Sequence, residues 1–174
     1  LGAIPLMLSY VGARNHGTVD NASGVATVLE AAAALPSSAR VGVLITDAEE
    51  LALAGARAWA RSRAPSVALN CDTVDDDGSL VVMFSRSRPE PLVAAIERAA
   101  LTAGERVRTM RLIPGVLTDH VALADAGWET LTLSRGNLRT LQRIHTSRDS
   151  LASMRGTGIA SAAQVLARTA TELG

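Results

Sequence analysis

Two adjacent carboxylates, Glu49 and Glu50, are the side chains of this sequence with the clearest chemical potential. They follow Val41–Ile45, an uncharged apolar run that is typical of a strand covered by helices on both faces of a parallel sheet. Small and apolar residues recur at helical spacing from Leu51 onward, so we expect a helix to begin almost at once. A strand end that meets a helix start is the usual place for a site in an open α/β sheet. The pair is also consistent with two acids that only complement a helix dipole.

Further acids and one histidine follow other predicted strands. Asp20 lies past a strand predicted over Pro5–Val11, Asp72 ends one over Val67–Cys71, and His145 follows a strand near the C-terminus. Carboxylates that gather at one sheet edge repel one another unless a cation neutralises them, and carboxylate oxygen with imidazole nitrogen suits zinc. Taken singly, each acid is better explained as a cap, a turn residue or a solvated charge. The residues alone leave both interpretations open.

The composition argues against several classes of partner. The chain has 174 residues, enough for one domain with a real core, and its 17 basic side chains balance 17 acidic ones. This balance gives no reason to expect a nucleic acid or an anionic membrane surface as partner. The single cysteine, Cys71, excludes an internal disulfide and a cysteine-based zinc site. No apolar run approaches the roughly 18 residues of a membrane span.

Predicted strands and helices alternate along the chain, which indicates an α/β fold. We expect a single three-layer α/β/α domain over residues 1–174, with helices on both faces of a mostly parallel (mixed) central sheet. Val107–Leu112, which two arginines interrupt, is predicted to be an edge strand, and Asp75–Asp77 is predicted to be a solvated turn. The other expected elements are strands over Val67–Cys71, Leu80–Phe84 and Trp128–Leu133 and helices over Asp20–Pro36, Pro89–Ala99, Thr118–Ala126 and Gly156–Leu173.

Four blocks of the sequence resemble the zinc aminopeptidases of the M28 family. They keep the family's order and approximate intervals over most of the chain. The two most specific are the DNASG block that begins at Asp20 and the adjacent glutamates. The full set comprises Asp20–Ala26 with Leu29 and Glu30, Thr46–Leu51, Asn70–Asp72, and His145-Thr146 with Asp149.

The resemblance implies a site with two zinc ions. Asp20 would bridge them, Glu50 and His145 would complete the protein ligands of one ion, and Asp72 would bind the other. Glu49 would be the general base that takes a proton from metal-bound water, whose pKa a dication lowers towards neutrality. The expected reaction is the removal of an N-terminal residue from a peptide by hydrolysis.

The resemblance also indicates the substrate and its pocket. Thr118-Asp119-His120 is similar to the family's SDH segment beside the substrate, so Asp119 and His120 are candidate substrate-binding residues for a peptide with a free N-terminus. The family further implies a location outside the cytoplasm, although Leu1–Met7 is too short for a signal peptide and lacks its basic flank. Nothing in the sequence indicates the residue preference or the oligomeric state.

One departure from the family concerns its first metal-binding histidine, which belongs to a His-x-Asp pair after the first strand. Arg14 stands at that place here, and the interval to Asp20 is shorter than in the family. His16 is the candidate replacement ligand; otherwise one metal subsite has been lost, or a loop is missing. The catalytic domains of the family are also longer at the N-terminus, so we expect sheet material to be absent from this chain.

Two rival functions stay open at this point. A single zinc held by Asp20, Glu50 and His145 would match the related glutaminyl cyclases, which bind a similar substrate end but cyclise it. The second rival is a catalytically silent domain that binds peptides. Arg14 favours the silent domain, because a guanidinium near the site opposes a second cation. Glu49 argues against a silent domain, since this side chain has no obvious structural role.

Overall fold

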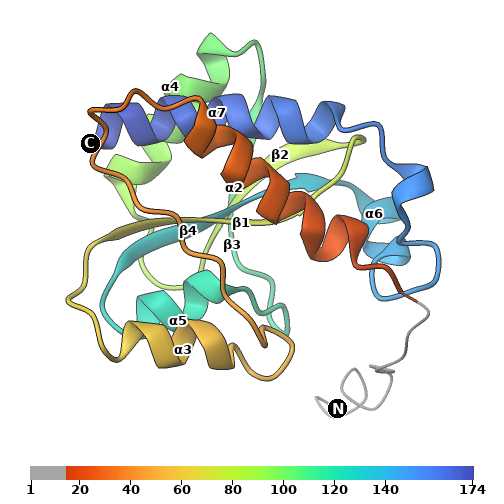
Figure 1. Ribbon diagram of the computed structural model, residues 1–174, viewed down its shortest axis with the longest axis horizontal. Helices are drawn as coiled ribbons and strands as arrows, with labels where there is room; N and C mark the ends of the chain where they lie inside the picture. Colours follow the sequence, from red (N-terminus) through yellow and green to blue (C-terminus); the bar gives the residue numbers. More distant parts are fainter. Residues whose placement is uncertain (1–14) are drawn as a thin grey trace.

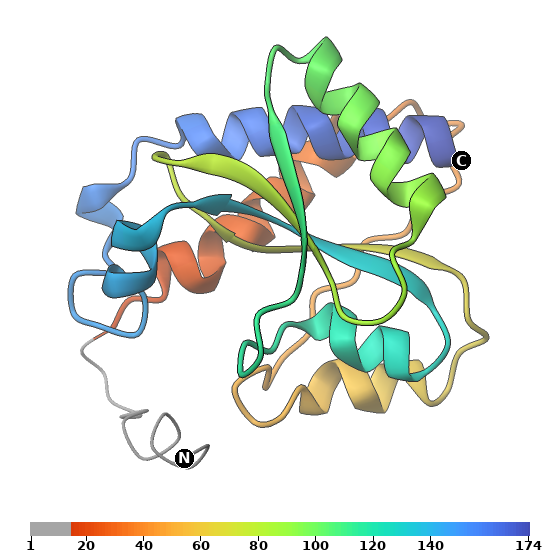
Figure 2. The same cartoon turned by 180° about the vertical axis from the view of Figure 1, so that it is seen from behind.

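In the part of the chain that the structure describes, a four-stranded sheet lies between two layers of helices (Figure 1). The computed structural model describes residues 15–174. Three long helices cover one face of the sheet and two short ones cover the other, as the reverse view also shows (Figure 2). The long helices are α2 (Ser23–Ala33), α4 (Glu90–Thr102) and α7 (Thr157–Leu173), and the short ones are α3 (Ala54–Ala60) and α5 (Asp119–Asp125). This arrangement confirms the predicted three-layer α/β/α fold.

The sheet is mixed, as predicted. Its strands are β1 (Val67–Val74), β2 (Ser79–Phe84), β3 (Val107–Arg111) and β4 (Glu129–Gly136), and they lie in the order β1-β4-β2-β3. β1 pairs with β4 and β2 with β3 in parallel, while β2 and β4 run antiparallel. Among the described strands β3 lies at the edge of the sheet, in agreement with its prediction. Its exposed Arg108 and Arg111 discourage further strand pairing there.

The main core lies between the sheet and the long helices. Leu80 and Val82 of β2 and Leu131 and Leu133 of β4 are completely buried, because alternate residues of a strand share one face. Full burial of one such side chain contributes about 1.5–3 kcal/mol. The two helices α4 and α7 supply the opposing apolar side chains at spacings of three or four residues, among them Leu92, Ile96, Ala162, Val165 and Leu166.

The predicted buried strand over Val41–Ile45 is wrong. In residues 15–174 this segment pairs with no strand, and its apolar side chains are exposed, from 38% for Leu44 to 55% for Ile45. An apolar run is buried only where strands and helices cover it, and the described sheet ends at β1. The helix that follows begins at Ala54 rather than directly after Glu50.

Three short elements complete the described chain: η1 (Thr18–Ala22), α6 (Leu138–Arg143) and η2 (Leu151–Ser153). The strand predicted over Pro5–Val11 and the residue Arg14 lie outside the described residues. None of the helices within residues 15–174 combines the length and the apolar character that crossing a membrane requires.

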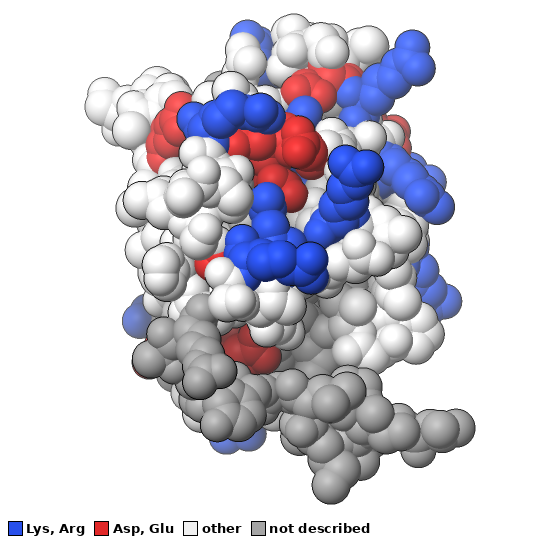
Figure 3. Space-filling model, turned by 90° about the vertical axis from the view of Figure 1, so that its right-hand side faces the viewer, with Lys and Arg blue, Asp and Glu red and all other residues white. Residues whose placement is uncertain are grey.

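The prediction of a solvated turn over Asp75–Asp77 is wrong for two of its three acids. Asp75 and Asp76 are buried, and only Asp77 is exposed. The Asp75 carboxylate accepts a hydrogen bond from the Thr140 hydroxyl at 2.7 Å and lies 2.8 Å from the Arg143 guanidinium, so it holds α6. Carboxylates and arginine side chains lie close together on this side of the molecule (Figure 3).

Asp76 caps α7 from a distant part of the chain. Its carboxylate accepts hydrogen bonds from the backbone N–H groups of Gly156 at 3.3 Å and Gly158 at 2.9 Å, and from the Thr157 hydroxyl at 3.0 Å. The Arg155 N–H also donates to it. The first N–H groups of a helix have no partner within the helix, so a carboxylate there satisfies them and complements the helix dipole.

Candidate metal centre

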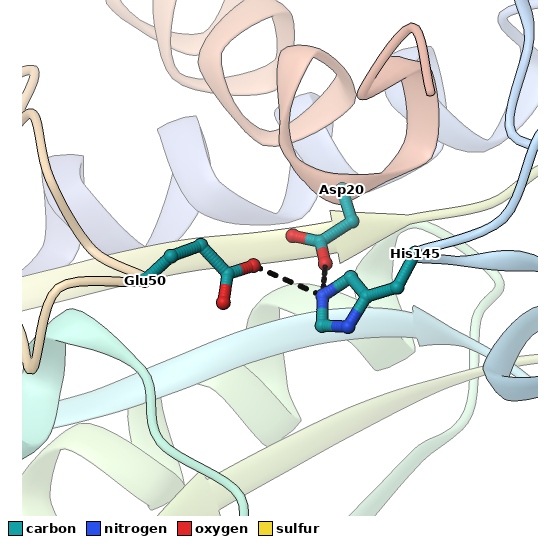
Figure 4. Close-up of side chains that lie close together, drawn as sticks. All are labelled: Asp20, Glu50 and His145. Carbon is teal, nitrogen blue, oxygen red and sulfur yellow. Dashed lines mark ion pairs between the residues drawn. The ribbon is translucent and has the colours of Figure 1, made fainter. Parts of the chain in front are cut away.

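Three of the predicted metal ligands converge in space. Asp20 lies in η1, Glu50 in the loop before α3 and His145 in the turn after α6, and their ligand atoms all lie within 4.8 Å of one another. The His145 Nε2 atom is 2.7 Å from Asp20 Oδ2 and 3.0 Å from Glu50 Oε1 (Figure 4). We call these three residues the acid–histidine cluster. It gathers donor groups from three segments that are far apart in the sequence.

Hydrogen bonds of Asn21 join the loop of Asp20 to the strand that carries Asp72. Its Oδ1 accepts from the backbone N–H groups of Gly24 and Thr73, both at 3.1 Å, and its Nδ2 donates to the Cys71 carbonyl at 3.3 Å. The two strand contacts flank Asp72 on either side. Asn21 therefore fixes the spacing between two predicted ligands, a role that its place in the sequence does not indicate.

Close packing explains why a glycine stands at position 24 in the DNASG block. A Cβ atom at this position would lie 2.1 Å from Asn21 Oδ1 and 2.6 Å from the Cys71 carbonyl oxygen, so any larger residue would displace the Asn21 bridge. Ser23 adds a second link between the same two segments. Its hydroxyl donates to the Val19 carbonyl at 2.6 Å and accepts from the Val74 N–H at 2.9 Å.

The adjacent glutamates differ in their surroundings. Glu50 belongs to the acid–histidine cluster, whereas Glu49 is outside it and half-buried. Burial is the main cause that raises the pKa of Glu49 to about 8, and the charges of Asp72, Glu50, Asp20 and Asp119 add to it. Glu49 therefore lies near all of these acids, but unlike Glu50 it is not a member of the acid–histidine cluster. Glu50 is thus placed as a candidate metal ligand, and Glu49 is placed as a carboxylate beside the ligands.

Asp72 and His16 do not belong to the acid–histidine cluster that the described residues form. Asp72 is buried near it: burial first, and then the charge of Asp20, raises the pKa of Asp72 to about 7. His16 is exposed, and its backbone N–H donates to the Asp149 carbonyl at 3.3 Å. The structure thus places Asp72 beside the cluster and leaves the predicted His16 ligand on the surface.

His120 lies in a buried hydrogen-bond network, and its role in substrate binding stays a prediction. Its side chain is completely buried, so it has no surface open to a substrate. Its Nδ1 lies 2.5 Å from the Thr118 hydroxyl and 2.7 Å from the Thr132 hydroxyl, and burial lowers its pKa to about 4, so a neutral imidazole ties α5 to β4. Asp119 is also largely buried, and one of its oxygens accepts a hydrogen bond from the Thr46 hydroxyl.

Comparison with known families identifies the chain. The model of peptidase family M28 matches residues 7–170. The chain belongs to peptidase family M28. Among curated proteins, none matches the sequence.

Solved structures with the same fold as this M28 chain include a zinc aminopeptidase from Bacillus subtilis, with a TM-score of 0.78 and 22% identity over 93% of this chain and 43% of that one. LapA aminopeptidase from Legionella pneumophila gives a TM-score of 0.72 and 19% identity over 94% of this chain and 48% of that one. An aminopeptidase from Aneurinibacillus sp. strain AM-1 gives a TM-score of 0.73 and 19% identity over 91% of this chain and 40% of that one. The M28 chain therefore spans half or less of the length of these structures.

The acid–histidine cluster suits a zinc ion chemically. A catalytic zinc has three protein ligands from the His, Asp, Glu and Cys set and keeps one position open for water. The cluster offers two carboxylates and one imidazole, and the side chains of Glu50 and His145 are 66% and 54% exposed, so water reaches it. The hydrogen bond to Asp20 is the main cause that raises the pKa of His145 to about 9, with the nearby carboxylates adding to it. A metal ion would displace that proton, because a ligating imidazole must be neutral.

Proposed function

We propose that this M28 chain carries the catalytic site of a zinc-dependent aminopeptidase. The single observation that supports this most strongly is the convergence of Asp20, Glu50 and His145 with Glu49 beside them. These groups come from three distant segments, and the carboxylates gathered around Glu49 repel one another unless a cation neutralises them. Membership of family M28 supports this proposal, as does the fold shared with the zinc aminopeptidase from Bacillus subtilis and the LapA aminopeptidase from Legionella pneumophila.

In this proposal Asp20, Glu50 and His145 would hold a zinc ion, and Asp20 together with Asp72 would provide ligands for a second one. Bound zinc supplies an acidified water molecule and polarises the scissile carbonyl. Glu49 takes the proton from the attacking water and passes it to the leaving amine, which a half-buried carboxylate outside the ligand set can do. The largely buried Asp119 contributes to the negative field that favours the free amino group of a peptide.

Substitution of Glu49 tests the proposal. Glu49→Gln should lower the turnover of an amino-acid p-nitroanilide by about 10²–10⁴-fold, because it removes the general base. Zinc content per chain should stay at the parental level, since Glu49 lies outside the cluster. Glu30→Gln, at an exposed position of α2, is the matched control and should keep parental turnover. Parental turnover in a zinc-loaded Glu49→Gln protein would exclude the assigned role.

A specific observation favours a second candidate function with one zinc. The structure groups Asp20, Glu50 and His145, and neither Asp72, which lies beside this group, nor the exposed His16 is a member of it. A single ion of this kind would support cyclisation of an N-terminal glutaminyl residue, in which the substrate's own amine is the nucleophile. One zinc per chain, with ammonia release from a glutaminyl peptide and no hydrolysis of p-nitroanilides, would favour this candidate over the aminopeptidase.

A further inference from the structure

Asp149 is a buried acid that contacts the backbone of a predicted metal ligand. It has no solvent exposure, and it lies four residues after His145. Its Oδ1 accepts a hydrogen bond from the Val19 N–H at 2.7 Å, and its Oδ2 accepts one from the Asp20 N–H at 3.2 Å. Both of its carboxylate oxygens therefore serve a segment about 130 residues away in the sequence.

The backbone N–H and carbonyl of Asp149 also form hydrogen bonds. The Asp149 N–H donates to the Thr146 carbonyl at 3.0 Å, which closes a turn directly after His145. The Asp149 carbonyl accepts from the His16 N–H at 3.3 Å. Asp149 thus belongs to the turn of one ligand, His145, while its side chain holds the backbone of another, Asp20.

Only a carboxylate fits these contacts. A buried carboxylate is costly unless hydrogen bonds compensate for the lost water, and here two backbone donors do so. An asparagine has the same shape but only one acceptor oxygen, and its NH₂ group would face one of the two N–H donors. A purely apolar residue would leave the buried Val19 N–H and the partly buried Asp20 N–H without their acceptors, which is unfavourable because a buried donor without a partner loses its bond to water.

We infer that Asp149 is a positioning residue of the metal centre, which sets the distance between Asp20 and His145. This inference rests on the proposed zinc site. Zinc binds carboxylate oxygen and imidazole nitrogen within narrow ranges near 2.0–2.2 Å, and a ligand must be held to about 0.5 Å for full affinity. A residue that joins the two ligand segments by direct hydrogen bonds controls that geometry. Substitutions of groups that orient ligands typically cost 10–100-fold in metal affinity.

The matched pair Asp149→Asn and Asp76→Asn separates positioning from stability. Asp76 is also a buried carboxylate that accepts backbone N–H groups, but it serves the start of α7 rather than a ligand segment. Zinc affinity is measured for both variants by competition with a chromophoric chelator, at a temperature where circular dichroism shows both to be folded. We expect about 10–100-fold weaker binding for Asp149→Asn and less than a threefold change for Asp76→Asn. The visible spectrum of bound Co²⁺ should change only for Asp149→Asn.

A measurement on the parental protein keeps the inference testable if Asp149→Asn does not fold. The amide protons of Val19 and Asp20 should be protected from exchange in zinc-free protein, because Asp149 accepts both. Rapid exchange of these two amides would overturn the inference, as would equal zinc affinity in the two variants. Absence of zinc binding in the parent would instead refute the proposed function, and protected amides would then show that Asp149 holds the Asp20 loop without a metal to position.

Discussion

Asp76 is expected to stabilise the fold in a pH-dependent way. Burial alone would raise the pKa of its carboxyl, but the hydrogen bonds from Arg155, Gly158, Thr157 and Gly156 outweigh it and lower the pKa to about 2. The folded state therefore favours the charged form more than the unfolded chain does. A change of one pKa unit corresponds to about 1.4 kcal/mol, and the adjacent turn is open to water, so we discount the full shift to about 1–2 kcal/mol.

The sign of the pH effect follows from linkage. The folded pKa is lower than the unfolded value near 3.9, so the contribution of Asp76 is complete above about pH 4 and is lost as the pH falls towards 2. Asp76→Asn cannot titrate. The difference in the free energy of unfolding between parent and variant should thus be largest above pH 5 and shrink below pH 4.

Urea unfolding at pH 7, 5 and 3 measures this difference. Asp77→Asn is the matched control, because Asp77 is the neighbouring acid and is exposed. It should change the free energy of unfolding by less than about 0.5 kcal/mol at each pH. A parent–variant difference for Asp76 that stays constant from pH 5 to pH 3 would refute the argument that its charged form is what the helix start stabilises.

Two further predictions concern the ligand segments. Gly24→Ala should destabilise the protein by more than about 2 kcal/mol in thermal unfolding, because its Cβ would overlap Asn21 Oδ1 and the Cys71 carbonyl; parental stability would show that the close approach is absent in solution. Asp20→Ala should release zinc more readily than Asp72→Ala in a metal titration, since the proposed role of Asp20 serves both ions. Tighter binding in the Asp20 variant would exclude the bridging role.

Local patterns predicted most of the fold. Apolar alternation and flanking turn residues placed all four strands of the described sheet, and Pro89 and Gly156 marked where two helices begin. These features depend on neighbours in the sequence, so the sequence alone carries them. The run Val41–Ile45 has the same local pattern, yet it is exposed, because burial of a strand depends on what lies beside it in space.

The candidate site was predictable to a similar extent. The sequence identified Asp20, Glu50 and His145, which the structure brings together, because each follows a predicted strand or a recognisable block. It did not indicate that His120 is buried and it predicted the acidic turn wrongly, since a histidine or aspartate in the sequence is the same whether it lies on the surface or in a buried hydrogen-bond network. The hydrogen-bond donors to Asp76 at the start of α7 are backbone N–H groups, which no residue type in the sequence indicates.

The hydrogen bonds around Asp20 join the DNASG block to Asp149, four residues after His145. Asp20 contributes one carboxylate to the cluster, but η1 is kinked at this point, because Asp20 and Asn21 have non-helical backbone angles, so other groups must hold the segment. Asn21 links that loop to the strand of Asp72, and Asp149 links it to the turn of His145. Three predicted ligand segments are thus joined through the backbone beside Asp20. A change at either linking residue should therefore alter metal geometry before it alters the sheet, whose core contains neither residue.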